Sequence, residues 1–479
     1  MNIHVVRHCG EFKDGVRLEF AVEGSGASGC EHGFSAKVGR AKLCAAPDGT
    51  RLVIGLGKAE ELDMDGFRAA VALAMQTAAS QELPTLVVDS GHVAGIGLGD
   101  TALTELVISA SLAGYRFTAF KSSTDDADSP CSLTLCGDER ELDGRLAQAS
   151  ALVEGVILAR NLVNTPANAA TPEYLAEVAL ELGRTHGFGV EVLGPEEITA
   201  LGMGCFAAVF RGSEIPPRFI ILDSKPGSTE RPMVFIGKGV TFDTGGISLK
   251  PAAKMHEMKG DMAGAAAVLG LFKAMGRAGQ ETPRVVGLLP CTENVPGSRA
   301  TKPGDVVTAM NGTTVEILNT DAEGRLILAD ALCYSARFNP EAIVDLATLT
   351  GACLVALGPK VAAVFANTAA LDRQIREGGS RVGERFWPMP LWKEYGARLK
   401  SDVADLKNIA TREGGAIYAA LFLKHFVPDG VDWAHLDIAG PAWSDESTSI
   451  YRAGGTGFGV RTLWELVRGQ EADGAETAL

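Results

Sequence analysis

The stretch that decides how this chain folds is FIGKGVTFDTGGISLK, residues 235–250. It starts as an apolar strand and continues into a glycine-rich segment that carries Lys238, Asp243 and Lys250. In open α/β sheets, ligands bind beyond the carboxyl ends of the strands. We therefore predict that a strand over residues 233–236 delivers Lys238 and Asp243 to a site at that edge of a sheet.

A second stretch, MKGDMAGAAAV at residues 258–268, contributes another carboxylate. Asp261 stands directly ahead of a helix that we predict over residues 263–276. By itself, an acidic residue in that place is most often a helix cap. The glycines and lysines of the neighbouring stretch are what favour a functional interpretation.

The third stretch, NTDAEGRLILADAL at residues 319–332, carries Asp321, Glu323 and Arg325 at a spacing of two. Side chains at that spacing diverge on a helix, whereas they share one side of an extended segment. We therefore predict an extended segment that passes into a helix near Leu326.

Four carboxylates from these stretches would raise one another's pKa unless cations compensated their charge. Two divalent metal ions, helped by Lys238 and Lys250, would provide that compensation. Taken singly, each acidic residue has an ordinary explanation as a turn residue, a helix cap or a first-turn charge. Glycines beside the carboxylates permit the close approach of a ligand, and this favours a shared site.

Strand and helix signals alternate along the chain, which predicts an α/β fold in two domains. Residues 1–150 form an N-terminal α/β domain with a mainly parallel sheet, and residues 151–479 form a larger α/β catalytic domain. An Asn311-Gly312 turn predicts a hairpin between strands at 306–310 and 313–317. The other expected strands cover residues 51–56, 85–89, 189–193, 218–222, 284–289 and 343–346, and further helices cover residues 65–79, 101–112 and 141–162.

The composition narrows the classes of partner. The chain has 479 residues and a formal net charge of -15, which argues against general affinity for nucleic acid or anionic membranes. The most apolar late stretch, residues 346–367, is interrupted by glycine, proline and lysine, so we expect no membrane span there. Nine cysteines lack a C-x-x-C pair, and we expect reduced thiols in a cytoplasmic protein.

These stretches resemble the leucyl aminopeptidase (cytosol aminopeptidase) family of two-metal exopeptidases. NTDAEGRL at residues 319–326 is the signature of that family. The resemblance covers residues 150–470 and implies a catalytic domain like that of the zinc exopeptidases, while the first third matches only in length and α/β pattern. Further blocks agree in order and spacing: NTPAN (164–168), DLATLTGA (345–352), HLDIAG (435–440) and GGTGFGVR (454–461).

The resemblance implies a ligand set for two metal ions. Asp243 and Glu323 would bridge both ions, and Lys238 and Asp261 would complete the tighter site. Asp321 would serve the looser site. Oxygen and amine ligands of this kind suit Zn²⁺ or Mn²⁺, with Mg²⁺ or Co²⁺ also possible.

The same resemblance assigns the chemistry. A water between the metals would attack the first peptide bond, and Lys250 would stabilise the oxyanion. Arg325 would hold a bicarbonate ion that relays the proton. The backbone around Leu349 would line the substrate site, with Met258 and Ala442 in the apolar pocket for the first side chain.

The predicted function is therefore a metal-dependent aminopeptidase that releases the N-terminal residue, preferably a leucine-like one, from peptides. The family implies a homohexamer. A catalytically dead scaffold is disfavoured because the seven metal-binding and catalytic residues of the family are all present, and a DNA-binding role is disfavoured by the acidic balance. A phosphate-loop motif is absent from the sequence.

An aspartic protease is the main rival hypothesis. Asp243-Thr244-Gly245 and Asp89-Ser90-Gly91 both match its short motif. Aspartic proteases are nearly all-β, whereas this chain is rich in predicted helices. Inhibition by chelators, and not by pepstatin-like compounds, would separate the two.

Overall fold

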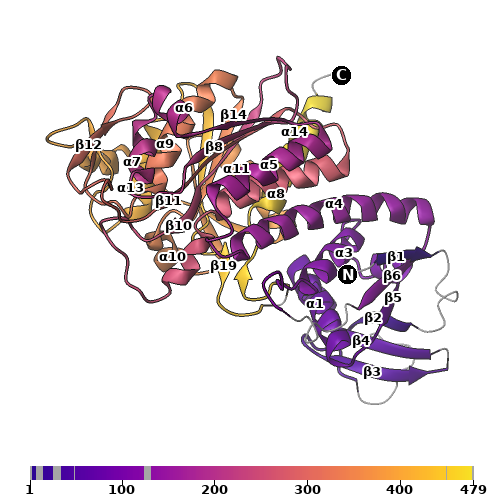
Figure 1. The fold of residues 1–479 in the computed structure, drawn as a ribbon. Coiled ribbons are helices and arrows are strands. Elements are labelled where there is room, and N and C mark those ends of the chain that lie inside the picture. The colour runs from indigo at the N-terminus through magenta and orange to yellow at the C-terminus, as the bar shows by residue number, and fades with distance from the viewer. Residues whose placement is uncertain are drawn as a thin grey trace. The chain divides into compact units, whose positions relative to one another are not determined.

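Two α/β units make up the chain in a computed structural model (Figure 1). The structure describes residues 3–6, 15–24, 34–47, 49–122, 131–448 and 450–476. One unit comprises Met1–Val153 with Asp445–Ala453, and the other comprises Glu154–Ser444 with Gly454–Leu479. The segment 445–453 therefore groups with the first unit although it lies late in the sequence.

The first unit contains a six-stranded sheet in the order β1-β6-β5-β2-β4-β3. All neighbouring strands run parallel except β3, which is antiparallel to β4. This confirms the mainly parallel sheet that the alternating pattern predicts. Its elements are β1 (Ile3–Val6), β2 (Val16–Val22), β3 (Ala41–Ala46), β4 (Gly49–Gly57), η2 (Ala59–Glu61), α1 (Met64–Ser80), β5 (Thr85–Asp89), α2 (Ser90–Ala94), α3 (Ala102–Ala113) and β6 (Ser132–Cys136).

Two cysteines in this unit correct the expectation of reduced thiols. Cys44 on β3 and Cys136 on β6 each take part in a disulfide bond, and they are not partners of each other because their strands are not neighbours in the sheet. Sequence spacing does not reveal which cysteines the fold brings together, so the bonds were not predictable from the pattern. The free thiols among the described residues belong to Cys131, Cys205, Cys291, Cys333 and Cys353.

The second unit is built on a nine-stranded mixed sheet in the order β16-β15-β18-β14-β9-β11-β8-β7, with β10 paired to β11. Helices α5, α8, α11 and α14 lie on one side of it, and α7, α9 and α13 lie on the other (Figure 1). The strands are β7 (Gly189–Leu193), β8 (Arg218–Asp223), β9 (Met233–Gly237), β10 (Gly239–Asp243), β11 (Val285–Asn294), β14 (Ala342–Ala347), β15 (Val361–Ala366), β16 (Arg385–Pro388) and β18 (Asp432–Asp437).

Most helices of the second unit lie against this sheet. The long helix α4 begins in the first unit and ends in the second. The bounds of these helices are α4 (Glu139–Asn164), α5 (Pro172–His186), α6 (Pro195–Ala200), α7 (Gly204–Phe210), η3 (Met255–Gly260), α8 (Ala263–Ala278), α9 (Gly324–Ser335), η4 (Ala336–Phe338), α10 (Gly351–Leu357), α11 (Ala369–Val382), α12 (Lys393–Gly396), η5 (Ala397–Leu399), α13 (Gly415–Lys424) and α14 (Val460–Glu476).

Two small sheets complete the unit. The predicted hairpin around Asn311-Gly312 is present as β12 (Asp305–Thr308) and β13 (Thr314–Ile317), with β17 (Leu406–Lys407) on its other edge. A second pair joins β19 (Trp443–Ser444) to β20 (Gly454–Gly455).

Three parallel strands at the centre of the large sheet set the position of the site. β14 pairs with both β9 and β18 in parallel register. Their carboxyl ends therefore meet at one edge, where Lys238 follows β9, Thr348 follows β14 and Asp437 ends β18. This edge is where an open α/β sheet presents its ligand-binding groups.

Helix α4 contains a window, Leu142–Asn164, that is long and apolar enough to cross a membrane by length and composition. The window also carries Arg160, which is fully buried and donates a hydrogen bond to the Gly455 carbonyl over 3.0 Å. The burial of 56% of its most apolar 18-residue stretch is typical of a core helix in a folded domain.

Glycines let α4 and α8 approach each other closely. A Cβ added at Gly155 would lie 2.3 Å from the carbonyl oxygen of Gly270, and one added at Gly270 would lie 2.6 Å from that of Gly155. Backbone atoms cannot move aside as a flexible side chain can, so the close approach depends on both glycines. It positions α8, the helix that follows Asp261.

We expect Gly155→Ala to destabilise the protein by about 1–3 kcal/mol, because the new methyl group overpacks a helix crossing. Gly144→Ala in the same helix is the matched control, since a Cβ there meets nothing within 4 Å. That change should be neutral or stabilising by up to about 1 kcal/mol. Thermal unfolding of both variants checks this, and equal midpoints would contradict the crossing geometry.

Candidate metal centre and active site

The predicted carboxylates converge at the carboxyl edge of the large sheet. One carboxylate oxygen from each of Asp243, Asp261 and Glu323 lies within 4.8 Å of the others, and all three residues are buried. One detail differs from the prediction: Asp243 ends a strand of its own, β10, which pairs with β11. The side chains thus come from the end of β10, the segment between η3 and α8, and the start of α9.

Lys238 lies among these carboxylates. Its Nζ is 2.8 Å from Asp261 and 2.8 Å from Glu323, and it donates to the Thr348 carbonyl over 3.1 Å. Burial alone would lower the pKa of Lys238, but the negative charges of Asp261, Glu323 and Asp243 raise it above its usual range. The lysine therefore compensates part of the charge of the cluster.

Lys250 connects the cluster to the fourth carboxylate. Its Nζ lies 2.8 Å from Asp243 and 2.5 Å from Asp321. Burial would lower the pKa of Lys250, but Asp243 and Glu323 raise it above its usual range. The structure thus brings together Lys238, Lys250 and the four predicted carboxylates.

The two lysines do not neutralise all the negative charge of the four carboxylates. Burial raises the pKa of Asp243, and repulsion from Glu323 adds to this effect. Burial also raises the pKa of Asp261 well above its usual range. Glu323 Oε2 is buried and accepts no hydrogen bond in the described structure. Four carboxylates facing two lysines, with an unpartnered carboxylate oxygen, form a donor set that fits divalent cations.

Glycines are required where the chain segments meet. Gly245 has a φ of +88°, and a Cβ there would lie 2.8 Å from Asp321 Oδ1. At Gly324 a Cβ would lie 2.7 Å from Lys238 Cε. The glycines beside the carboxylates therefore allow the cluster itself to close, in addition to admitting a ligand.

The prediction of an extended segment before Leu326 is wrong. Glu323 has helical dihedrals, with φ −77° and ψ −36°, and α9 begins at Gly324. The Asn319 side chain accepts a hydrogen bond from the Asp321 amide over 2.9 Å and so stabilises a turn. This turn, and not an extended strand, turns Asp321 and Glu323 toward the two lysines.

Arg325 occupies the first turn of α9 and is buried. Its Nη1 donates to the Asn408 carbonyl over 2.8 Å, while its Nε is buried with no hydrogen-bond partner in the described structure. Burial lowers the pKa of Arg325 to about 10, so the side chain is still a cation at neutral pH. A buried guanidinium with an unsatisfied N–H can hold a small anion.

Three polar residues that the sequence pattern did not indicate support the cluster. Asn294 donates to Asp243 Oδ1 over 2.8 Å, and the Thr348 hydroxyl donates to Asp261 Oδ1 over 2.7 Å. The third is Asp437, at the end of β18. A carboxylate just beyond the carboxyl end of an apolar strand was the signal that pointed to Asp243, and the same signal after the mostly apolar stretch of residues 433–436 could have pointed to Asp437.

Asp437 organises the loop that follows β14. It is fully buried and accepts hydrogen bonds from the Leu349 amide over 3.2 Å and from the Thr350 hydroxyl over 2.7 Å. Since the preceding residue, Thr348, contacts both Lys238 and Asp261, the carboxylate of Asp437 indirectly holds the cluster of carboxylates and lysines in register.

The predicted substrate residues lie in segments beside the cluster. Leu349 is half-buried in the loop that Asp437 organises. Met258 lies in η3, whose Lys259 is over the Trp443 ring at 5.8 Å, and Ala442 is the buried neighbour of that tryptophan. Their roles in binding stay predictions.

Asp89, the other half of the rival aspartic protease motif, caps α2. Its carboxylate accepts from the Gly91 amide over 2.7 Å and from the His92 amide over 3.3 Å. The α/β fold of both units removes the basis for the all-β protease hypothesis.

Comparison with known proteins identifies the class. Residues 157–464 match the catalytic domain of the cytosol aminopeptidase family, and residues 23–124 match the N-terminal domain of that family. The chain therefore belongs to the cytosol aminopeptidase family, which confirms the resemblance. It is an aminopeptidase of that family.

Individual relatives agree. A probable cytosol aminopeptidase of Nitratidesulfovibrio vulgaris is 54% identical over 435 residues, which cover 87% of this chain and 84% of that protein. Among solved structures, the bottromycin maturation enzyme BotP in complex with Mn has a TM-score of 0.87 at 38% identity, covering 96% of this chain and 100% of that chain. A mutant of tomato leucine aminopeptidase has a TM-score of 0.86 at 35% identity, covering 98% of this chain and 96% of that chain.

We expect Asp437→Asn to lower kcat/KM about tenfold or more, because a displaced loop misaligns the reacting groups. The amide nitrogen would face N–H donors, and stability should fall by about 1–3 kcal/mol. Thr350→Ser keeps the hydroxyl that bonds Asp437 and should retain activity. Peptidase assays and thermal unfolding check both variants. Full activity in Asp437→Asn would show that the loop does not depend on this carboxylate.

Proposed function

We propose that this protein is a metal-dependent leucyl aminopeptidase that removes the N-terminal residue, preferably a leucine-like one, from peptides. The observation that carries the proposal is the buried cluster of carboxylates and lysines, in which Glu323 Oε2 has no hydrogen-bond partner among the described residues. Such a cluster keeps all its carboxylates ionised near neutral pH only if further positive charge joins it.

The donor set supports two cation sites. Asp243 and Glu323 would contribute to both, Lys238 and Asp261 would complete one, and Asp321 would serve the other. Zn²⁺ and Mn²⁺ are the first candidates, with Mg²⁺ and Co²⁺ as alternatives, since oxygen and amine ligands accept each of them. The relationship to BotP, whose structure is in complex with Mn, supports manganese in particular.

The cations, when bound, would polarise the scissile carbonyl and lower the pKa of the attacking water. Lys250 lies at the edge of the cluster and would donate to the oxyanion that develops on that carbonyl. Arg325, with its unpartnered Nε, would hold a bicarbonate ion in position to accept the proton of the water.

The substrate and its setting follow from the neighbouring segments. The backbone at Leu349 would align the peptide, and Met258 and Ala442 would accept an apolar first side chain. The leucine preference is further supported by the similarity to tomato leucine aminopeptidase.

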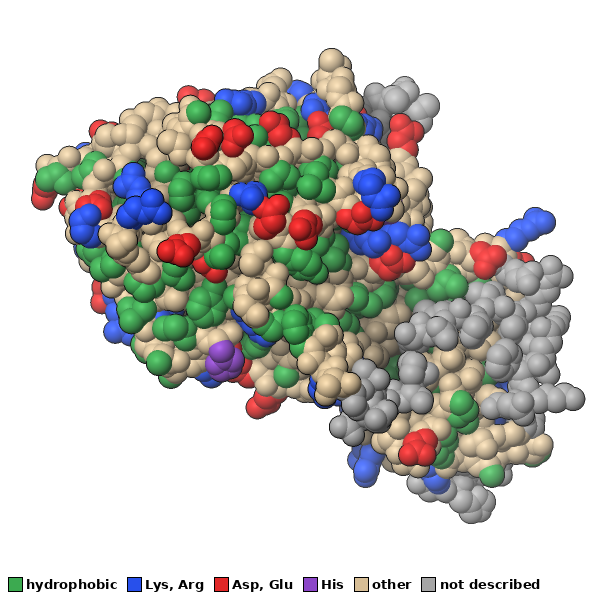
Figure 2. Space-filling view, in the orientation of Figure 1, with side chains coloured by type: hydrophobic (Ala, Val, Ile, Leu, Met, Phe, Trp, Pro, Cys, Tyr) green, Lys and Arg blue, Asp and Glu red, His purple; other side chains and the backbone are tan. Residues whose placement is uncertain are grey.

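We also propose a cytoplasmic homohexamer, as the family name and resemblance suggest. Acidic and basic side chains are intermixed on the face of the larger unit in Figure 2, which favours peptides over nucleic acid as partners.

Glu323→Ala should lose bound metal and nearly all turnover together, because this residue would contact both ions. Arg325→Ala should retain the metals yet lose rate by about 10²–10⁴-fold, as for other losses of proton transfer. Elemental analysis of the purified variants, together with turnover of leucinamide, checks both. A metal site emptied by Arg325→Ala would contradict the assigned roles.

The protein should cleave Leu-Gly-Gly to leucine and Gly-Gly, and leave N-acetyl-Leu-Gly-Gly essentially untouched. A free amine can bind a cation, whereas an acetylated nitrogen has no available lone pair, and the resulting misalignment costs about 10²-fold or more in rate. Mass spectrometry after equal incubation measures both reactions. Comparable hydrolysis of the acetylated peptide would exclude an aminopeptidase.

A further inference from the structure

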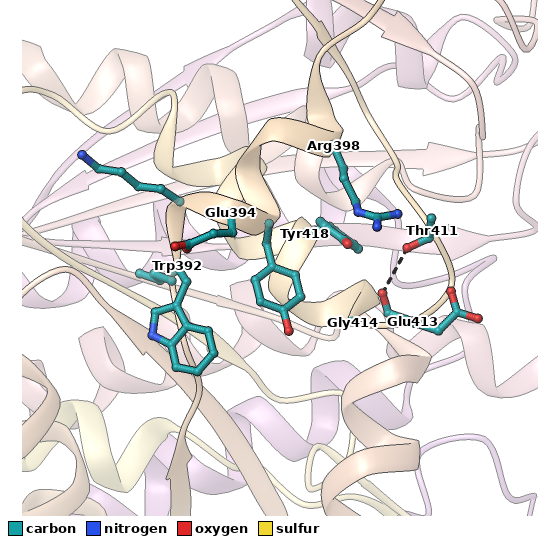
Figure 3. Close-up of a pocket in the computed structure, with 10 residues that line it drawn as sticks. Trp392, Glu394, Arg398, Thr411, Glu413, Gly414 and Tyr418 are labelled. Atoms are coloured by element: carbon teal, nitrogen blue, oxygen red, sulfur yellow. Dashed lines mark hydrogen bonds between the residues drawn. The ribbon is translucent and has the colours of Figure 1, made fainter.

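We propose that an open cavity of about 1100 Å³ in the second unit binds the part of the peptide substrate beyond the cleaved bond (Figure 3). One wall comes from residues 391–398, which include α12, and the other comes from residues 411–418, which lead into α13. The inference rests on the proposed aminopeptidase function and extends it to the downstream residues of the substrate.

The cavity lies close along the chain to the segment that contacts Arg325. The Asn408 carbonyl accepts the hydrogen bond of Arg325 over 2.8 Å, and Thr411, three residues later, lines the cavity. Three residues of chain span at most about 11 Å. The rim of the cavity is therefore within a short peptide's reach of the guanidinium proposed to take part in the reaction.

The far end of the same wall contacts the substrate loop. A Cβ added at Gly415 would lie 3.2 Å from Ala352 Cβ, in the first turn of α10. That helix begins two residues after Leu349, whose backbone would align the substrate. The segment that contacts Arg325 and the segment that contacts α10 thus both continue directly into the wall of this cavity.

Aromatic side chains supply apolar surface in the cavity. The Tyr395 ring lies between those of Trp392 and Tyr418. Its centroid is 6.3 Å from that of Trp392 and 5.7 Å from that of Tyr418. Trp392 is 62% exposed, although a side chain of this size usually gains from being covered. Exposed aromatic faces of this kind bind peptide planes and apolar side chains.

Charged side chains supply polar contacts. In Figure 3 the Arg398 guanidinium points across the cavity toward Thr411, and Glu413 lies beyond on that wall. Neither Arg398 nor Glu413 has an ion pair within the described ranges. Lys393 and Glu394 also line the cavity, so its formal charges balance, and the contact expected for the free C-terminal carboxylate of a short peptide is the geometric one with the unpaired Arg398 guanidinium.

The expected occupant is thus the downstream segment of a peptide of three or four residues, since an extended chain advances about 3.3 Å per residue. Leucinamide, which has no downstream residue, is the reference substrate. The informative quantity is the kcat/KM for leucine release from Leu-Ala-Phe-Ala divided by that for leucinamide.

Trp392→Leu and Arg398→Gln should each lower this ratio about three- to tenfold, through loss of an aromatic contact and of a charged contact respectively. Amidating the C-terminus of the tetrapeptide should remove most of the effect of Arg398→Gln and little of that of Trp392→Leu. Trp387→Leu and Arg373→Gln are matched controls, because both residues are exposed and lie outside the cavity lining.

Binding of N-acetyl-Ala-Phe-Ala, measured by calorimetry, provides a test that needs no turnover. Wild type should bind it more tightly than either cavity variant. Failure of wild type to release leucine from any substrate would reject the proposed function, while this titration would still decide the cavity. The inference is overturned by ratios and affinities equal to those of the controls. It is also overturned by variants that change only the assembled mass in sedimentation, since the cavity would then be a contact between copies.

Discussion

The burial of several carboxylates in one place is the constraint on which the rest of this structure depends. Asp243, Asp261 and Glu323 bring oxygens within 4.8 Å of one another in a buried region. In a medium of low polarity this repulsion opposes folding unless cations lie between the charges. Lys238 and Lys250 provide two such cations. The negative charge that they leave uncompensated makes the site suited to metal ions.

The surrounding strands, glycines and buried Asp437 keep the clustered side chains close together. Three adjacent parallel strands end at the same edge, and glycines at positions such as Gly245 and Gly324 let the segments that follow come within contact distance. Asp437 then organises the loop after β14 by accepting three hydrogen bonds, from the amides of Leu349 and Thr350 and from the Thr350 hydroxyl. A rigid sheet edge, small residues and a buried carboxylate together keep like charges close to one another.

Membership of the cytosol aminopeptidase family agrees with the chemistry of the buried cluster. The family match supports aminopeptidase activity, whereas the preference for leucine, the metal and the proton relay are proposals that depend on side chains of this chain. Arg325 illustrates the distinction. Its unpartnered Nε, its contact with Asn408 and its lowered pKa are properties of this structure, and they are the reasons for assigning it an anion.

The sequence by itself determined the α/β class, several strands and helices, and the identity of the clustered residues, because periodicity and short motifs are local. Strand 85–89 and strand 189–193 have the predicted bounds, and Lys238 follows its strand as expected. The turn at Asp321 is local, since the Asn319 side chain that stabilises it lies two residues away, but the alternating spacing of Asp321, Glu323 and Arg325 pointed to an extended segment instead. The separate strand that ends at Asp243 and the bonded state of Cys44 and Cys136 were decided by tertiary structure, because each depends on partners that are not adjacent in sequence. The positioning role of Asp437 belongs with them, because the Leu349 amide that it binds lies 88 residues away along the chain.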